Sequence, residues 1–367
     1  CVLCVGKQMG LVSTSGLEGV GIDLEQPLPW SSEEQIVNVP AKLLRIWVDT
    51  PHHEVSVGAL GLIAASRLSA MPLSKDELDV CADFLGSSFQ GVSPESRTAI
   101  RGFYQQLLSR LRASTHAAAR AVKGEANHIA LRGSATAPAQ VLSDAEAFLN
   151  QVASMIRRWL HAGSSYPVTA TALTYLEYAL EAGLDDYELS AQSAARDEQF
   201  PFTVPLADAS MTQALLQLLK NRFEAVSNKA FSLLKRFPKP LPSLESHAAV
   251  QGQLVNPIIE LMRGARDFES HNASLHLALY YRIYINGLGW KPIKFCQSPS
   301  TTPSGDPLRD PSLQMIEDVL DFVEEQLAFA RANGLSAASE GHPLMGGMAC
   351  VERLYSAIAK DESLHSP

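Results

Sequence analysis

The stretch from Ala209 to Pro242 reads ASMTQALLQLLKNRFEAVSNKAFSLLKRFPKPLP. Apolar residues recur at helical spacing on both sides of a break near Phe223–Val226, and three prolines end the stretch. These apolar residues are Leu215, Leu216, Leu218, Leu219 and Phe223, then Val226, Ala230, Phe231, Leu233, Leu234 and Phe237. Neither helix can bury its apolar face alone, so a pair of this kind needs neighbouring pairs. The stretch therefore predicts an α-solenoid.

The rest of the chain has the same texture. About twelve amphipathic helices are expected, with no convincing alternation at period two. Helix pairs recur at roughly 35–50 residues, which is typical of armadillo and HEAT repeats. We expect an all-α, armadillo/HEAT-type superhelix of degenerate helix pairs over residues 31–361, after a poorly ordered or remnant segment at 1–30. Exposed loops are expected near 114–140, where a helix tail precedes the loop, and near 184–205 and 296–312.

Local signals place several helix ends. A helix opening near Ser32 should be interrupted by Pro40 and restart after it. Ser74 and Glu77 have the spacing of a capping box, in which each side chain satisfies the backbone N–H of the other residue. Pro94 suits the first position of a further helix. Another helix is expected to begin at Asp144.

Composition limits the class of protein. The chain has 367 residues, 46% of them apolar, and a formal net charge of −9, so a surface that is basic throughout is excluded. Its five cysteines are scattered, which favours a reducing compartment and a cytoplasmic location. Neither a signal peptide nor an apolar run of about 18 residues is visible, so no membrane contact is expected. Because the chain does not begin with methionine, we interpret it as a fragment of a longer protein.

No motif predicts catalysis. The sequence has no GxSxG, HExxH or P-loop, and no glycine-rich S-adenosylmethionine motif between a strand and a helix. His52 and His53 are adjacent and have no third ligand at helical spacing, so a surface pair is favoured over a metal site. We therefore expect no catalytic, cofactor-binding or metal-binding residues.

Basic clusters are the strongest candidates for function. They are Arg97, Arg101, Arg110, Arg112, Arg157, Arg158, Lys220, Arg222, Lys229, Lys235, Arg236 and Lys239. Corresponding helix ends line up along one edge of a solenoid, so separate clusters can merge into a stripe that suits a phosphate backbone. The alternative is a set of solvated helix faces that keep the protein soluble.

Several segments together resemble the THADA-like family, which comprises the thyroid adenoma-associated protein and its fungal relatives. Leu215–Pro242 is similar to the family's leucine-rich pair that ends in "FP.PLP", although Arg222–Lys229 replaces a more acidic turn. Val92–Ser114 and Ala147–Ala182 resemble further helices of the family. Leu288-Gly289-Trp290 and His342–Gly346 resemble its "LGW" and "PLHG" elements. The resemblance covers most of residues 35–360.

The resemblance implies a function. Members of the family are α-solenoid scaffolds, and the fungal ones partner an FtsJ-type methyltransferase that modifies the 2′-hydroxyl of tRNA nucleotide 32. The partner binds S-adenosylmethionine and catalyses the reaction, while the scaffold positions the tRNA. The chain is thus expected to be a non-catalytic accessory subunit without a cofactor, and its basic residues become candidate tRNA contacts. The alternative is a protein–protein adaptor of importin or trafficking type with no RNA role.

Overall fold

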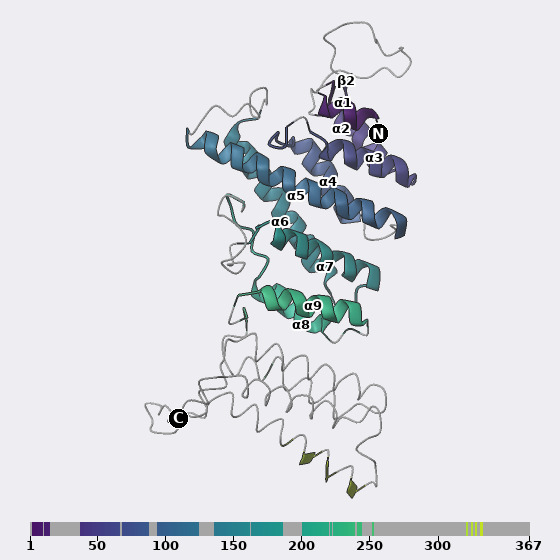
Figure 1. The fold of residues 1–367 in the computed structure, drawn as a ribbon, viewed down its shortest axis with the longest axis vertical. Helices are drawn as coiled ribbons and strands as arrows, with labels where there is room; N and C mark the ends of the chain where they lie inside the picture. The colour runs from purple at the N-terminus through teal and green to yellow at the C-terminus, as the bar shows by residue number, and fades with distance from the viewer. Residues whose placement is uncertain are drawn as a thin grey trace, which may run out of the picture. The chain divides into compact units, whose positions relative to one another are not determined.

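The computed structural model of the chain is shown in Figure 1. It divides into a first unit, Cys1–Leu206, and a second unit, Ala207–Pro367, which are treated separately below. The residues that the structure describes are 2–9, 11–14, 37–66, 68–87, 94–124, 136–161, 163–185, 200–219, 221, 223–238, 241–243 and 252, with 321, 324–325, 327–328 and 331–332.

Helices make up nearly all of the described secondary structure, so the all-α prediction is confirmed. The first unit contains α1 (Val2–Gln8), β1 (Val12–Ser13), β2 (Val37–Asn38), α2 (Ala41–Val48), α3 (His53–Ala64), α4 (Lys75–Ser87), α5 (Pro94–Val122), α6 (Pro138–Trp159) and α7 (Tyr166–Glu181). The second unit contains α8 (Ala209–Leu218) and α9 (Glu224–Arg236).

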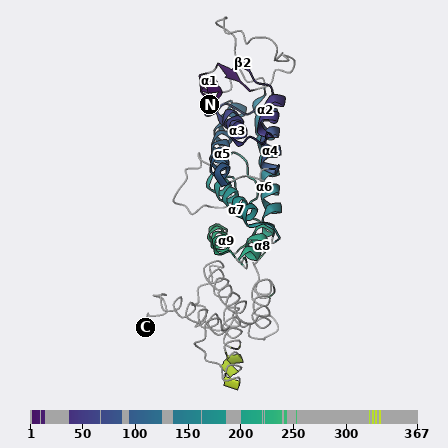
Figure 2. The same ribbon diagram turned by 90° about the vertical axis from the view of Figure 1, so that its right-hand side faces the viewer.

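The helices of the first unit form two layers. Figure 2 shows α2, α4 and α6 in one row and α3, α5 and α7 in the other, so successive helices alternate between the rows. Helices pack within each row, as α4 does on α6 and α3 on α5, and also across the rows, as α5 does on α6. This is the stacking of helix pairs that the apolar spacing predicts.

Leucine and aromatic side chains fill the space between the layers. Leu107, Leu149 and Leu176, from α5, α6 and α7, are each completely buried. The rings of Tyr104 on α5 and Tyr175 on α7 are stacked, with their centroids 4.3 Å apart. Each of these helices thus contributes its apolar face to the core. The helices follow one another in the stack in the order in which they occur in the chain.

The loop expected at 114–140 is shorter than predicted. Helix α5 continues to Val122, and α6 begins at Pro138 rather than at Asp144. The extension of α5 is rich in alanine, the residue with the highest helix propensity, and both Ala117 and Ala118 are buried. The helix tail expected in this stretch thus extends to Val122, and the exposed loop expected near 114–140 does not include residues 114–122.

The N-terminal segment is also more ordered than expected. Within 1–30, α1 packs on α3, and β1 pairs in parallel with β2, with Val12 opposite Val37. The helix expected from Ser32 is absent over 37–40, where the backbone N–H of Val39 bonds to the carbonyl oxygen of Ser13 at 2.8 Å. Pro40 disfavours helical geometry at the residue before it, and the helix begins after it, as predicted.

Part of the loop expected at 184–205 is buried. Leu184, Phe200 and Val204 are at most 7% exposed. The N–H of Val204 donates to the carbonyl oxygen of Leu184 at 2.9 Å, which holds this segment against the end of α7. The loop expected at 296–312 and the helices expected beyond residue 243 lie outside the described residues.

In the second unit, α8 and α9 pack against each other as the predicted pair. The side chain of Asp208 caps α8 by accepting a hydrogen bond of 2.8 Å from the N–H of Met211. The break between the helices falls at residues 219–223, slightly earlier than predicted. Leu215 and Leu234 are completely buried, as their spacing predicts.

The stacked tyrosines provide a test of this core. The hydroxyl group of Tyr104 is buried and has no hydrogen-bond partner among the described residues. Such a group costs about 1–3 kcal/mol, so Tyr104→Phe should leave the free energy of unfolding unchanged or raise it by up to about 1 kcal/mol. Tyr104→Ala should lower it by about 3–5 kcal/mol through the cavity it leaves. Urea unfolding measures both values, and a loss above about 1 kcal/mol for Tyr104→Phe would contradict this description.

Candidate functional site

Helix α5 carries four of the twelve predicted basic contacts, and its geometry separates them. At 3.6 residues per turn, Arg97, Arg101 and Arg112 fall within about 60° of one another around the helix axis, whereas Arg110 lies about 160° from Arg112. The first three side chains are half-buried. Arg110 is on the side of α5 that faces the core, with 6% of its surface exposed.

Arg110 binds backbone carbonyl groups around the end of α3. Its Nε donates to the carbonyl oxygen of Met71 at 3.1 Å, and its Nη2 donates to that of Pro72 at 3.2 Å. Its Nη1 donates to the carbonyl oxygens of Ile63 and Ala65. The prediction that Arg110 contacts tRNA is therefore wrong: all three of its nitrogens serve the fold.

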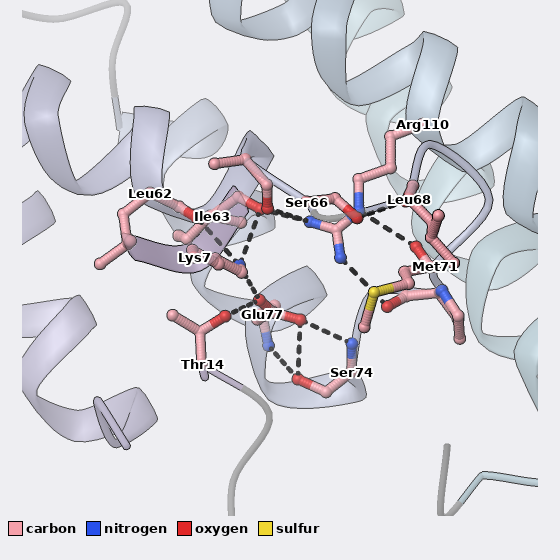
Figure 3. A network of polar contacts seen from close by, with 12 residues as sticks. Lys7, Thr14, Leu62, Ile63, Ser66, Leu68, Met71, Ser74, Glu77 and Arg110 are labelled. Atoms are coloured by element: carbon pink, nitrogen blue, oxygen red, sulfur yellow. Dashed lines mark hydrogen bonds and ion pairs between the residues drawn. The ribbon is translucent and has the colours of Figure 1, made fainter. Parts of the chain in front are cut away.

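A second buried cation reaches the same helix end (Figure 3). The Nζ of Lys7, on α1, donates to the carbonyl oxygens of Leu62 at 2.9 Å and Ile63 at 3.3 Å. The last carbonyl groups of a helix have no partner within the helix and carry a partial negative charge. Lys7 and Arg110 together therefore stabilise the C-terminus of α3.

Glu77 balances this positive charge. Its Oε1 lies 3.0 Å from the Nζ of Lys7 and accepts a short hydrogen bond from the hydroxyl of Thr14. Its Oε2 accepts a hydrogen bond of 2.8 Å from the backbone N–H of Ser74, while the Ser74 hydroxyl accepts one of 3.2 Å from the N–H of Glu77. The predicted capping box is confirmed, and the same carboxylate ties α4 to the N-terminal segment.

Burial and charge act in opposite directions on these groups. Burial alone would raise the pKa of Glu77, but Lys7, Arg110 and the hydrogen bonds from Thr14 and Ser74 hold that pKa below its ordinary value. Burial lowers the pKa of Lys7 from its ordinary value, although the neighbouring Glu77 opposes this shift. Burial raises the pKa of the Cys81 thiol above its ordinary value. Because the thiolate is the reactive form, this cysteine is unreactive.

The two arginines of α6, Arg157 and Arg158, also differ in their surroundings. A guanidinium N–H of Arg157 donates a short hydrogen bond to the carbonyl oxygen of Pro205, which fixes the segment before the second unit. Arg158 is exposed. Of the two, Arg158 is therefore the better placed to meet a ligand.

In the second unit, the predicted basic contacts that the structure describes lie on α9. Lys235 is exposed, and its Nζ is 5.0 Å from the ring centroid of Phe231; Lys229 and Arg236 are half-buried. Lys220, Arg222 and Lys239 lie outside the described residues. Because the two units are described separately, the predicted merging of all clusters into one stripe stays a prediction.

Two basic residues near the end of α5 were missed by the sequence reasoning. Arg120 and Lys123 are exposed and continue the basic side of the helix. Their helical spacing from Arg112 could have revealed them, but the alanine-rich stretch was expected to be a helix tail followed by an exposed loop. Lys7 was missed because no local pattern marks a lysine whose partner lies 70 residues away.

Other site chemistry is sparse in the described part of the chain. Within it, no three His, Cys, Asp or Glu side chains gather in a way that could hold a metal ion. Nor is any helix in those ranges both long and apolar enough to cross a membrane. The candidate site residues that the structure does describe are the basic side chains on α5, α6 and α9.

Comparison with known proteins finds a matching family model and relatives that are tRNA (32-2′-O)-methyltransferase regulators. A family model described as "Trm732, TPR repeats" matches residues 24–228. The tRNA (32-2′-O)-methyltransferase regulator trm732 of Schizosaccharomyces pombe is 26% identical over 220 residues, which cover 60% of this chain and 14% of the relative. The tRNA (32-2′-O)-methyltransferase regulator THADA of Canis lupus familiaris is 24% identical over 312 residues, or 82% of this chain and 15% of the relative.

The chain thus spans about a seventh of the length of the curated relatives it matches. The repeats in the family description are of the TPR type, whereas the sequence spacing predicted armadillo or HEAT repeats. The starts of α2 and α4 are 34 residues apart, which equals the TPR period. Starts of α4 and α6 are 63 residues apart, because α5 is long and a connection follows it.

The structural role of Arg110 can be tested by comparison with Arg120. Arg110→Met leaves the bound carbonyl groups without their donor and should lower the free energy of unfolding by about 2–5 kcal/mol. Arg120→Met removes an exposed charge from the same helix and should change it by no more than about 0.5 kcal/mol. Denaturant unfolding compares the two. Equal effects of the two substitutions would show that Arg110 is not a buried anchor.

Proposed function

The chain belongs to the Trm732 family of TPR-repeat proteins, and we propose that it is part of a regulator of tRNA ribose 2′-O-methylation. The single observation that carries this proposal is the family match over residues 24–228. It is supported by relatives from a yeast and a mammal, each a regulator of a tRNA (32-2′-O)-methyltransferase. The site of modification is then the ribose of nucleotide 32.

In this proposal, the chain is a scaffold and the reaction takes place on its partner. A methyltransferase of the FtsJ type would bind S-adenosylmethionine and transfer the methyl group. The stacked helices of the first unit offer a long, rigid surface on which a tRNA can be held in register with that partner. Holding two reactants in a fixed geometry supplies a large part of the rate enhancement in a two-substrate reaction.

The candidate tRNA contacts are the predicted basic residues other than Arg110, which is buried and bonded to backbone carbonyl groups. With Arg110 set aside, the described ones that remain are Arg97, Arg101, Arg112, Arg157, Arg158, Lys229, Lys235 and Arg236. Arg157 is the weakest candidate of these, because one of its N–H groups already donates a hydrogen bond to the carbonyl oxygen of Pro205. A cytoplasmic location accompanies this proposal, since Cys4 and Cys81 are free thiols, as expected in a reducing compartment.

The proposal is tested by deletion and co-purification. Tagged full-length protein should co-purify with an FtsJ-type methyltransferase, because a regulator has to contact its enzyme. Cells that lack the protein should lose 2′-O-methylation at tRNA nucleotide 32, as mapped by ribose-methylation sequencing. Methylation at an unrelated ribose in the same tRNA pool is the control. Unchanged methylation at nucleotide 32 would exclude the proposal and favour a protein–protein adaptor without an RNA role.

A further inference from the structure

We propose that the outer side of α5 is a docking surface for an RNA phosphate backbone. This basic face of α5 is defined by Arg97, Arg101, Arg112, Arg120 and Lys123. The inference rests on the proposed function for its choice of ligand, and on the geometry of α5 for its location. It adds Arg120 and Lys123 to the surface, excludes Arg110, and assigns the contact to phosphates rather than to bases.

The basic face extends along nearly the whole length of the helix. Helix α5 has 29 residues. At 1.5 Å per residue, the distance from Arg97 to Lys123 along the axis is about 39 Å. The five residues fall within about 140° around the axis at 100° per residue. Arg97 lies at the edge of the buried arc, and the other four lie beyond it, so the face points away from the core.

Uncharged polar residues fill the gap in the middle of this face. Between Arg101 and Arg112, the same side of the helix carries Gln105 and Ser109, both exposed. Amide and hydroxyl groups bond to phosphate and to the ribose 2′-hydroxyl without reading the base. The sequence of α5 contains one acidic residue, Glu95, in its first turn. An approaching phosphate backbone therefore meets no carboxylate along the rest of the helix.

Three of the cations on this face, Arg101, Arg120 and Lys123, are available for binding. Arg120 and Lys123 are exposed, and Arg101 is half-buried. Within the described ranges, none of these three forms an ion pair; the two pairs found there are Lys7–Glu77 and Arg45–Asp83. Binding RNA would not require these three side chains to give up a carboxylate partner.

Helices α4 and α5, which lie in different layers of the first unit, differ in the charge of their exposed sides. The exposed side of α4, in the other row of helices, carries Asp76, Asp79 and Asp83. A chain with a net charge of −9 repels a polyanion except where cations are concentrated. Of these two helices, α5 is thus the one that a polyanion can approach.

Arginine-rich composition suits the proposed ligand. Four of the five side chains are arginines, whose planar guanidinium groups form two parallel hydrogen bonds to phosphate oxygens. A row of such groups on one straight helix follows a backbone and offers no pocket for a base. We therefore expect binding that depends strongly on salt and weakly on sequence.

The test uses the full 367-residue chain and an unmodified tRNA transcript. The triple variant Arg101→Gln, Arg120→Gln, Lys123→Gln removes three cations and keeps good helix formers. Its affinity for the tRNA should be about 10–100-fold weaker near 0.15 M salt, and its log–log salt slope should fall by about 2–3. Fluorescence anisotropy at several salt concentrations measures both quantities. Circular dichroism should show the same helix content and melting temperature as the wild type.

A matched control removes the same charge from the other layer. Lys42→Gln, Arg45→Gln, Lys75→Gln on α2 and α4 should leave the affinity within about twofold. An equal loss in this control, unchanged affinity and slope in the α5 variant, or no tRNA binding by the wild type would each overturn the proposal. Vesicles containing phosphatidylserine form a second arm. If the α5 variant loses vesicle binding and keeps tRNA binding, the face serves an anionic membrane and not RNA.

The outcome is separable from that of the proposed function. If α5-dependent tRNA binding is found but deletion leaves nucleotide 32 methylated, the docking surface stands and the proposed function fails. If deletion abolishes that methylation but the α5 variant binds tRNA normally, the proposed function stands and this docking surface is overturned.

Discussion

One buried carboxylate, that of Glu77, connects α1, the residue after β1 and the start of α4 at the N-terminal end of the first unit. It pairs with Lys7 on α1, accepts from Thr14 after β1 and from Ser74 at the start of α4, and compensates Arg110 on α5. The C-terminus of α3 lies between the two cations, which bind its last carbonyl groups. Breaking such a buried pair by removing one partner costs several kcal/mol, because a charge is then left unpaired out of water. The first layers of the stack therefore depend on this carboxylate.

The same network gives α5 two different sides. On the inner side, Arg110 is fully engaged by carbonyl groups, and Leu107 and Tyr104 pack in the core. On the outer side, Arg101, Arg120 and Lys123 have no ion-pair partner in the described part of the chain. A rigid helix held firmly from behind presents its outer cations in fixed positions, which limits the entropy lost when they bind a ligand. Structural and binding arginines thus differ by their position around one helix axis.

Apolar spacing was sufficient to predict the all-α fold and the α8–α9 pair. The spacing of Ser74 and Glu77 was sufficient to predict the capping box. All three features depend on residues close in sequence. Charge clustering predicted Arg101, Arg110 and Arg112 together, since a run of arginines does not show which of them faces the core. The long-range partners of Lys7 could not be predicted, because they meet it only after the chain folds. The extent of the helix tail at the end of α5 could not be predicted, because its small side chains give a weak amphipathic pattern, although alanine favours the helix.

The measurement that tests the central role of Glu77 most directly is hydrogen exchange resolved along the chain, comparing Glu77→Gln with the wild type. Asp79→Asn is the matched control, because it removes an exposed carboxylate from the same helix. We expect amides of α1 and β1 and the C-terminal turn of α3 to exchange faster in Glu77→Gln, by at least about tenfold. Amides of α6 and α7 should keep their protection, and Asp79→Asn should match the wild type. Unchanged exchange in α1 and β1, or the same increase in both variants, would contradict the account.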